Sequence, residues 1–80
     1  MRLDDVVLRY VAGEVVCSAW EITEFVRLND GTREEAAELL ERWQRLAWLE
    51  TVSEASDDGP QLMALTEQAF AAHPGLSAAI

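Results

Sequence analysis

Apolar residues recur at intervals of three and four positions in three stretches of the chain, which is the spacing of one face of an α-helix. The first stretch covers residues 3–12, the second follows Ser18, and the third follows Thr32. The third stretch has the longest and most regular apolar stripe, made of Ala36, Leu39, Leu40, Trp43 and Ala47, with Leu46 beside it. The pattern therefore predicts three amphipathic helices, of which the third is the longest.

Polar residues between these stretches predict where the helices begin and end. Ser18 and Glu21 have the spacing of a capping box, in which a hydroxyl and a carboxylate bond to the backbone of the first helical turn. Thr32 and Glu35 repeat that spacing before the third helix. Residues 29–31 (Asn-Asp-Gly) favour left-handed or turn geometry, so we expect the second helix to end there.

Two kinds of extended segment are predicted. After Gly13 ends the first helix, residues 14–17 (Glu-Val-Val-Cys) favour an extended piece or a very short strand. Residues 48–52 and 62–65 are predicted to form the strands of a hairpin, with residues 57–60 (Asp-Asp-Gly-Pro) as its turn.

The fold class predicted from these elements is mainly α with a small β-hairpin. Thr66 is expected to cap a short last helix, which ends at the helix-breaking run 73–75 (His-Pro-Gly). Since 80 residues leave room for one core, we expect a single domain over residues 1–80. Its core would span residues 3–72, and residues 73–80 would form an apolar C-terminal tail.

The amino-acid composition restricts the kinds of partner and site that the chain can be expected to have. Acids outnumber arginines by 15 to 6, lysine is absent, and the formal net charge is −9. Because nucleic acids and anionic membranes attract cations, this charge disfavours binding to either. Cys17 and His73 are the only cysteine and the only histidine, so we expect no disulfide, no zinc site and no cofactor. The chain has no apolar run of the roughly 20 residues that span a bilayer, and its acidic start is unlike a signal peptide. We expect a soluble, cytoplasmic protein.

The order helix, extended piece, helix, tight turn, helix, hairpin and helix resembles the winged helix-turn-helix family of transcription regulators. The segments that carry the resemblance are 21–26 as the first helix of the motif, 29–32 as its turn, 35–46 as the recognition helix, 46–50 as the entry to the wing, and 64–69 as the exit from the wing into the last helix. The resemblance implies a three-helix core, a two-stranded wing and a short C-terminal helix. Ala47 and Ala69 stand where such proteins frequently have Gly, which implies a slightly different backbone at both positions.

Charge opposes the DNA binding that the resemblance implies. Winged-helix regulators place the outer face of the recognition helix in the major groove and lay the wing along the phosphates. The positions farthest from the apolar stripe are Glu34, Glu38, Glu41 and Arg45. The spacing also predicts two i,i+4 ion pairs, Glu38–Arg42 and Glu41–Arg45. No Lys or Arg follows Arg45, whereas five acids do: Glu50, Glu54, Asp57, Asp58 and Glu67.

This surface favours three classes of function to different degrees. The charge pattern favours a non-enzymatic regulatory module that binds a basic protein partner, or that occupies the nucleic-acid groove of such a partner as a DNA mimic. The predicted partner-binding residues are Glu34, Glu38, Glu41, Arg45, Trp48, Asp57 and Asp58. The alternative is a dimeric DNA-binding regulator adapted to high salt. An enzyme is the least favoured class, because no nucleophile–base pair, phosphate loop or metal-ligand spacing occurs.

The resemblance also implies a homodimer, because the first and last helices of winged-helix regulators commonly form the dimer interface. The expected interface residues are Leu3, Tyr10, Phe70 and Leu76. The alternative is that the tail folds back on its own domain or frays.

We also predict the burial of the three tryptophans, the cysteine and the histidine one by one. Trp43 is predicted to lie in the core, whereas Trp20 and Trp48 lie at the boundaries of elements and are candidates for partner contacts. We expect Cys17 to be a buried, inert thiol and His73 to be a surface residue.

Overall fold

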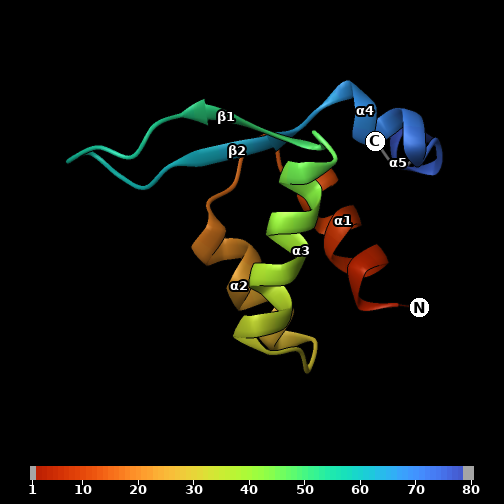
Figure 1. The fold of residues 1–80 in the computed structure, drawn as a ribbon, viewed down its shortest axis with the longest axis horizontal. Helices are drawn as coiled ribbons and strands as arrows, with labels where there is room; N and C mark the ends of the chain where they lie inside the picture. Colours follow the sequence, from red (N-terminus) through yellow and green to blue (C-terminus); the bar gives the residue numbers. More distant parts are fainter. Residues whose placement is uncertain (1, 79–80) are drawn as a thin grey trace.

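The computed structural model describes residues 2–78 of the 80-residue chain (Figure 1). Its elements in chain order are α1 (Leu3–Gly13), α2 (Ala19–Leu28), α3 (Arg33–Arg45), β1 (Leu49–Ser53), β2 (Leu62–Leu65), α4 (Glu67–Ala72) and α5 (Gly75–Ala78). The fold is mainly helical with a two-stranded antiparallel hairpin, as predicted, and it is compatible with a winged-helix-like arrangement. In Figure 1, α2 and α3 lie below the hairpin, and α4 and α5 lie on the side away from the hairpin turn.

Both predicted capping boxes are present. The hydroxyl of Ser18 accepts a hydrogen bond from the backbone N–H of Glu21 at 3.2 Å, and the Glu21 carboxylate accepts one from the N–H of Ser18 at 3.1 Å. Thr32 and Glu35 make the same two bonds at the start of α3, at 3.1 and 3.0 Å. Because each box satisfies two backbone N–H groups that have no partner inside the helix, local sequence fixes where α2 and α3 begin.

The turn between α2 and α3 depends on two adjacent residues with different roles. Asp30 has the left-handed conformation, with a φ of 66°, and its N–H donates to the carbonyl of Arg27 at 3.2 Å. The N–H of Gly31 donates to the carbonyl of Val26 at 2.9 Å, which completes a Schellman motif. The left-handed residue is therefore the aspartate. Position 31 requires glycine because it has no room for a side chain. A Cβ there would lie 2.9 Å from Leu3 Cδ2 and 3.0 Å from the carbonyl oxygen of Val26.

A second Schellman motif ends α3 and leaves Ala47 outside the helix. The N–H of Ala47 donates to the carbonyl of Gln44 at 3.1 Å, and the N–H of Trp48 donates to that of Trp43 at 2.7 Å. Ala47 is exposed and has a φ of 59°. The predicted extension of the apolar stripe to Ala47 is therefore wrong. The backbone here has the geometry that glycine adopts most easily.

We predict that Ala47→Gly stabilises the fold by about 0.5–1 kcal/mol. The left-handed conformation costs an L-residue about 1–2 kcal/mol, and the greater entropy of glycine in the unfolded chain offsets part of the gain. Urea unfolding followed by circular dichroism measures the change. The control is Ala37→Gly, at an exposed position inside α3, which should destabilise the fold by about 1 kcal/mol. An equal loss of stability in both variants would contradict the prediction.

The hairpin is extended by one bridge from the segment before α2. Within the hairpin, a β-bulge shifts the register between Thr51 and Ser53. The N–H of Cys17 donates to the carbonyl of Met63 at 2.9 Å, and the N–H of Met63 donates to the carbonyl of Cys17 at 2.8 Å. The predicted extended piece 14–17 is thus confirmed at its last residue. Because β2 lies between β1 and the Cys17 segment, β1 is the outer strand.

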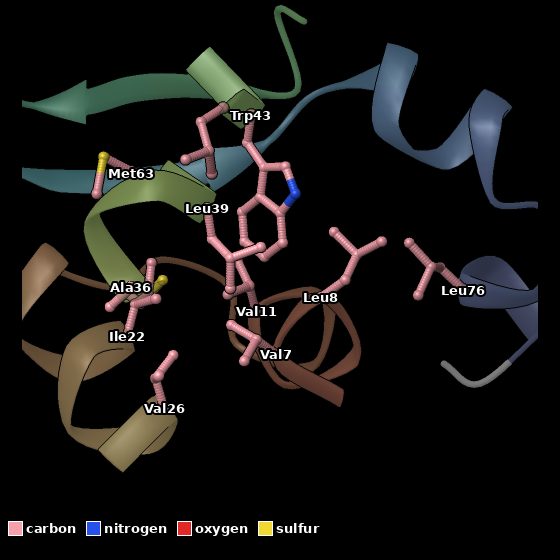
Figure 2. Packing of buried hydrophobic residues seen from close by; sticks show 12 residues of the cluster. Val7, Leu8, Val11, Ile22, Val26, Ala36, Leu39, Trp43, Met63 and Leu76 are labelled. Carbon is pink, nitrogen blue, oxygen red and sulfur yellow. The ribbon is translucent and has the colours of Figure 1, made fainter. Parts of the chain in front are cut away.

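Trp43 of α3 lies at the centre of the core. Its side chain is 2% exposed and extends toward Val11 and Leu8 of α1 (Figure 2), which confirms its predicted core position. The buried cluster joins helices, strands and the extended piece, and consists of Val7, Leu8, Val11, Cys17, Ile22, Val26, Ala36, Leu39, Trp43, Leu49, Met63 and Leu76.

The C-terminal segment folds back on its own chain. Leu76 of α5 is 5% exposed and points toward Leu8 of α1 (Figure 2). Leu76 was predicted to be a dimer contact, and this prediction is corrected, because the core of its own chain covers almost the whole side chain. Of the predicted tail, residues 79–80 lie outside the part of the chain that the structure describes.

Thr66 precedes α4 but does not cap it with its side chain. Its hydroxyl donates to the carbonyl of Ala47 at 2.5 Å, and its N–H donates to the carbonyl of Trp48 at 2.9 Å. These two bonds tie the start of α4 to the connection between α3 and β1.

Candidate interaction surface

The outer face of α3 carries the acidic residues that the periodicity placed there. All four predicted residues are exposed: Glu34, Glu38, Glu41 and Arg45. The guanidinium of Arg45 donates to the Glu41 carboxylate at 3.0 Å, which confirms the predicted pair. Since Arg45 is the one basic residue of this set and is paired, Glu34 and Glu38 give the outer face its net negative charge.

Arg42 does not pair with Glu38 as predicted. Its guanidinium faces the carboxylate of Asp4 in α1 at 3.9 Å, and Arg2 approaches the same carboxylate at 3.5 Å. Arg2, Asp4, Glu38 and Arg42 all line a cleft of about 330 Å³ between the start of α1 and α3. Arg42 lies on the flank of α3 that faces α1, and its charge lies between the two helices in the cleft that Glu38 also lines.

The acids of the hairpin turn are also exposed. Ser56 and Gly59 close the turn with backbone hydrogen bonds of 2.9 and 3.2 Å, and the N–H of Asp58 donates to the Ser56 hydroxyl at 3.2 Å. The carboxylates of Asp57 and Asp58 make no hydrogen bond to any of residues 2–78. Both residues therefore build the turn through their backbone and present their charge to solvent.

Most arginines lie next to acids. In the described residues, four of the six arginines have a carboxylate oxygen within 3.9 Å, and these are Arg2, Arg27, Arg42 and Arg45. The other two are Arg9 in α1 and Arg33 at the start of α3. Because an arginine paired with a carboxylate attracts phosphate less strongly, these ion pairs make contact with a nucleic-acid backbone less favourable.

Trp48 and Trp20, both candidates for partner contacts, differ in exposure. Trp48 is half-buried, and its ring meets the His73 imidazole edge-on, with ring centroids 5.0 Å apart. His73, predicted to be a surface residue, is therefore half-buried against an aromatic ring. Trp20 is 70% exposed at the start of α2. Of the two tryptophans, Trp20 offers the larger surface to a partner.

The remaining residues predicted at a dimer interface contact their own chain. Leu3 and Phe70 are half-buried against the core. Tyr10 stacks on Phe25 of α2, with ring centroids 4.1 Å apart and planes 10° from parallel. Each of these side chains keeps part of its surface exposed, so the predicted dimer stays a prediction for them.

Cys17 is buried, as predicted. Burial, and secondarily the charges of Glu21 and Glu14, raises the pKa of its thiol to about 11. A thiol with this pKa is protonated at neutral pH and is a poor nucleophile. Burial and the same two carboxylates also raise the pKa of the Tyr10 hydroxyl.

Four apolar side chains are exposed although none of them is among the predicted partner contacts, namely Val15, Leu28, Leu46 and Val52. Val52 lies at the bulge of the outer strand. The alternation of a strand places Val52 on the same face as the exposed Glu50 and opposite the buried Leu49, so its exposure agrees with the period of two.

Comparison with protein-family models, with curated proteins and with solved structures finds no match to this chain. Among residues 2–78, no group of three or more His, Cys, Asp or Glu side chains is placed to hold a metal ion. No helix in that part of the chain is long and apolar enough to cross a membrane. Function is therefore inferred from the surface.

Proposed function

We propose that this chain is a non-enzymatic winged-helix module that binds a basic protein partner through the outer face of α3 and the acidic hairpin. One observation carries the proposal. On the outer face of α3, the single cation Arg45 is paired with Glu41, and no Lys or Arg follows it in the sequence. The two surfaces with which a winged helix would meet DNA are therefore net negative.

Electrostatics gives the physical reason for a basic partner. Binding to DNA gains most of its nonspecific affinity when cations of the protein displace counterions from the phosphates. The hairpin has no cation for this exchange, and its exposed acids Glu50, Glu54, Asp57 and Asp58 would repel phosphate. The same charges attract a cationic surface and speed its association.

A DNA-binding regulator is the second candidate, and the local geometry of α2 and α3 favours it. The two helices are joined by four residues, 29–32, and the second begins with a capping box. This is the connection expected of a helix-turn-helix motif. Arg33 lies at the start of α3 and is exposed, so it is the cation that such a regulator would place nearest to DNA.

The test compares two defined probes. The chain is titrated into a fluorescently labelled arginine-rich peptide and into a labelled DNA duplex, each at low and at high salt. We expect the peptide to bind at low salt, to weaken at high salt, and to lose its binding in the Glu38→Arg, Glu41→Arg double variant. The variant should stay folded, because both side chains are exposed.

The matched control is the double variant Glu14→Arg, Glu24→Arg. It changes the net charge by the same amount at acids that lie outside the outer face of α3. Retained peptide binding in this control would show that position, and not total charge, determines affinity. Duplex binding without peptide binding would refute the proposal and establish the second candidate.

A further inference from the structure

One edge of the small sheet has no partner in the part of the chain that the structure describes. β2 is paired on both sides, with β1 and with Cys17. β1 is paired with β2 alone, and Figure 1 shows it along the upper margin of the molecule. From Glu50 to Ser53, every residue of β1 is exposed. An exposed strand edge presents backbone N–H and C=O groups that another extended chain can pair with.

The register shows which groups point outward. In an antiparallel pair, successive residues bond alternately toward the partner strand and away from it. The N–H of Thr66 donates to the carbonyl of Trp48, and Met63 directs its N–H and C=O toward Cys17. Met63 is the partner of Thr51 in the register. Thr51 and Met63 are therefore a non-hydrogen-bonded pair of the hairpin. The N–H and C=O of Thr51 consequently point to the outer edge of β1.

Charge determines what can occupy this edge. A second copy of the chain would bring the acids of two hairpins together, and like charges opposite each other destabilise a strand pair. The hairpin has no cation to relieve that repulsion, since no Lys or Arg lies between Leu46 and the end of the chain. Glu50 begins the exposed run of β1 and Glu54 directly follows the strand, so both acids complement a basic strand. Val52, 55% exposed, offers an apolar contact between them.

We infer that the basic partner binds as an extended segment that adds a strand to the outer edge of β1. The segment carries arginine or lysine residues that face Glu50 and Glu54, and its backbone exchanges hydrogen bonds with Thr51. This inference rests on the proposed function, because it names how the basic partner is bound. Backbone pairing supplies affinity in this mode of recognition, and alternate side chains supply specificity.

The probe is a short synthetic peptide of alternating arginine and valine residues with blocked ends. A second peptide has the same sequence and charge, but each backbone nitrogen of its central part is methylated and cannot donate. We expect the methylated peptide to bind about tenfold more weakly, as expected when hydrogen bonds are lost. Equal binding of both peptides would overturn the inference and leave the proposed function standing. Binding of neither would refute the proposed function itself.

Variants of Thr51 provide the test on the protein. Thr51→Pro removes the outward N–H, and proline is tolerated at a strand edge where the N–H faces solvent. Thr51→Ala is the matched control: it removes the hydroxyl, which accepts a hydrogen bond from the Gln61 amide at 2.8 Å, and keeps the N–H. We expect peptide binding to weaken in the proline variant alone, with circular dichroism showing that both variants fold. Equal binding by the two variants would contradict the inference.

A third measurement separates a second copy from a basic peptide. Sedimentation velocity is measured without peptide for the unmodified chain and for Thr51→Pro. We expect the two to have the same oligomeric state, because no second copy occupies the edge of β1. A dimer of the unmodified chain that Thr51→Pro dissociates would overturn the inference, because the edge would then be occupied by another copy. If Thr51→Pro fails to fold, the methylated peptide tests the same bonds on the unmodified chain.

Discussion

Replacing Trp43 with alanine is expected to lower the free energy of unfolding by about 3–5 kcal/mol. The side chain is 2% exposed and packs between α3 and α1 (Figure 2). It also lies two residues before the end of α3, where the carbonyl of Trp43 accepts the hydrogen bond from Trp48 that completes the Schellman motif. Small domains have only about 0.05–0.15 kcal/mol of stability per residue. For 80 residues this amounts to about 4–12 kcal/mol, so a loss of this size would remove a large fraction of the stability.

Trp20→Ala is the matched control, since it removes the same side chain from a position that is 70% exposed. Urea unfolding followed by far-UV circular dichroism should give a free energy of unfolding within about 0.5 kcal/mol of the unmodified chain for this variant. If the two variants lose equal stability, Trp43 is not the centre of the core. Trp20→Ala also has a second use, because it tests whether the exposed indole contributes to binding of the arginine-rich peptide.

The parts of the fold that depend on neighbours in sequence were predictable. The capping boxes at Ser18 and Thr32 join residues three positions apart, so the starts of α2 and α3 could be read from the sequence. β2 has the predicted bounds, Leu62–Leu65. The exposure of the acids on α3 followed from the helical period alone, because an apolar stripe on one face fixes which residues lie opposite it.

Contacts between residues far apart in sequence were not predictable. The helical spacing predicts that Arg42 pairs with Glu38, one turn away, but Arg42 faces Asp4 of another helix. The sequence predicts that Thr66 caps α4, but its hydroxyl bonds to Ala47, nineteen residues earlier. In both cases a local partner with the right spacing was available. The tertiary packing of the helices placed a second partner within reach, and the sequence contains no signal for it.

The candidate interaction surface also has one property that could be predicted from the sequence and one that could not. The negative charge of the outer face of α3 and of the hairpin follows from composition and helical period. The open edge of β1 does not, because it depends on which strand is outermost and on the register that turns Thr51 outward. Two strands joined by a turn predict a hairpin, whereas the bridge from Cys17 to Met63 decides which of its edges stays open.

Gly31→Ala is expected to destabilise the fold by about 1–3 kcal/mol, the range for overpacking in a filled core. The new Cβ would overlap Val26 Cγ1 and would lie 2.9 Å from Leu3 Cδ2. The leucine side chain can move, but Val26 is fully buried and its carbonyl accepts the hydrogen bond from Gly31. The strain therefore falls on the turn that sets the position of α3 relative to α2. Thermal or urea unfolding measures the loss.

Gly13→Ala tests the same substitution without the steric conflict. Gly13 is the last residue of α1, and a Cβ there would meet no atom within 4 Å. Alanine at this position is expected to stabilise the fold by about 0.5–1 kcal/mol, because glycine loses more conformational entropy on entering a helix. Opposite signs for the two variants would locate the conflict in the turn between α2 and α3. If Gly31→Ala also stabilises the fold, Val26 and Leu3 do not approach position 31 closely, and the turn is not set by this contact.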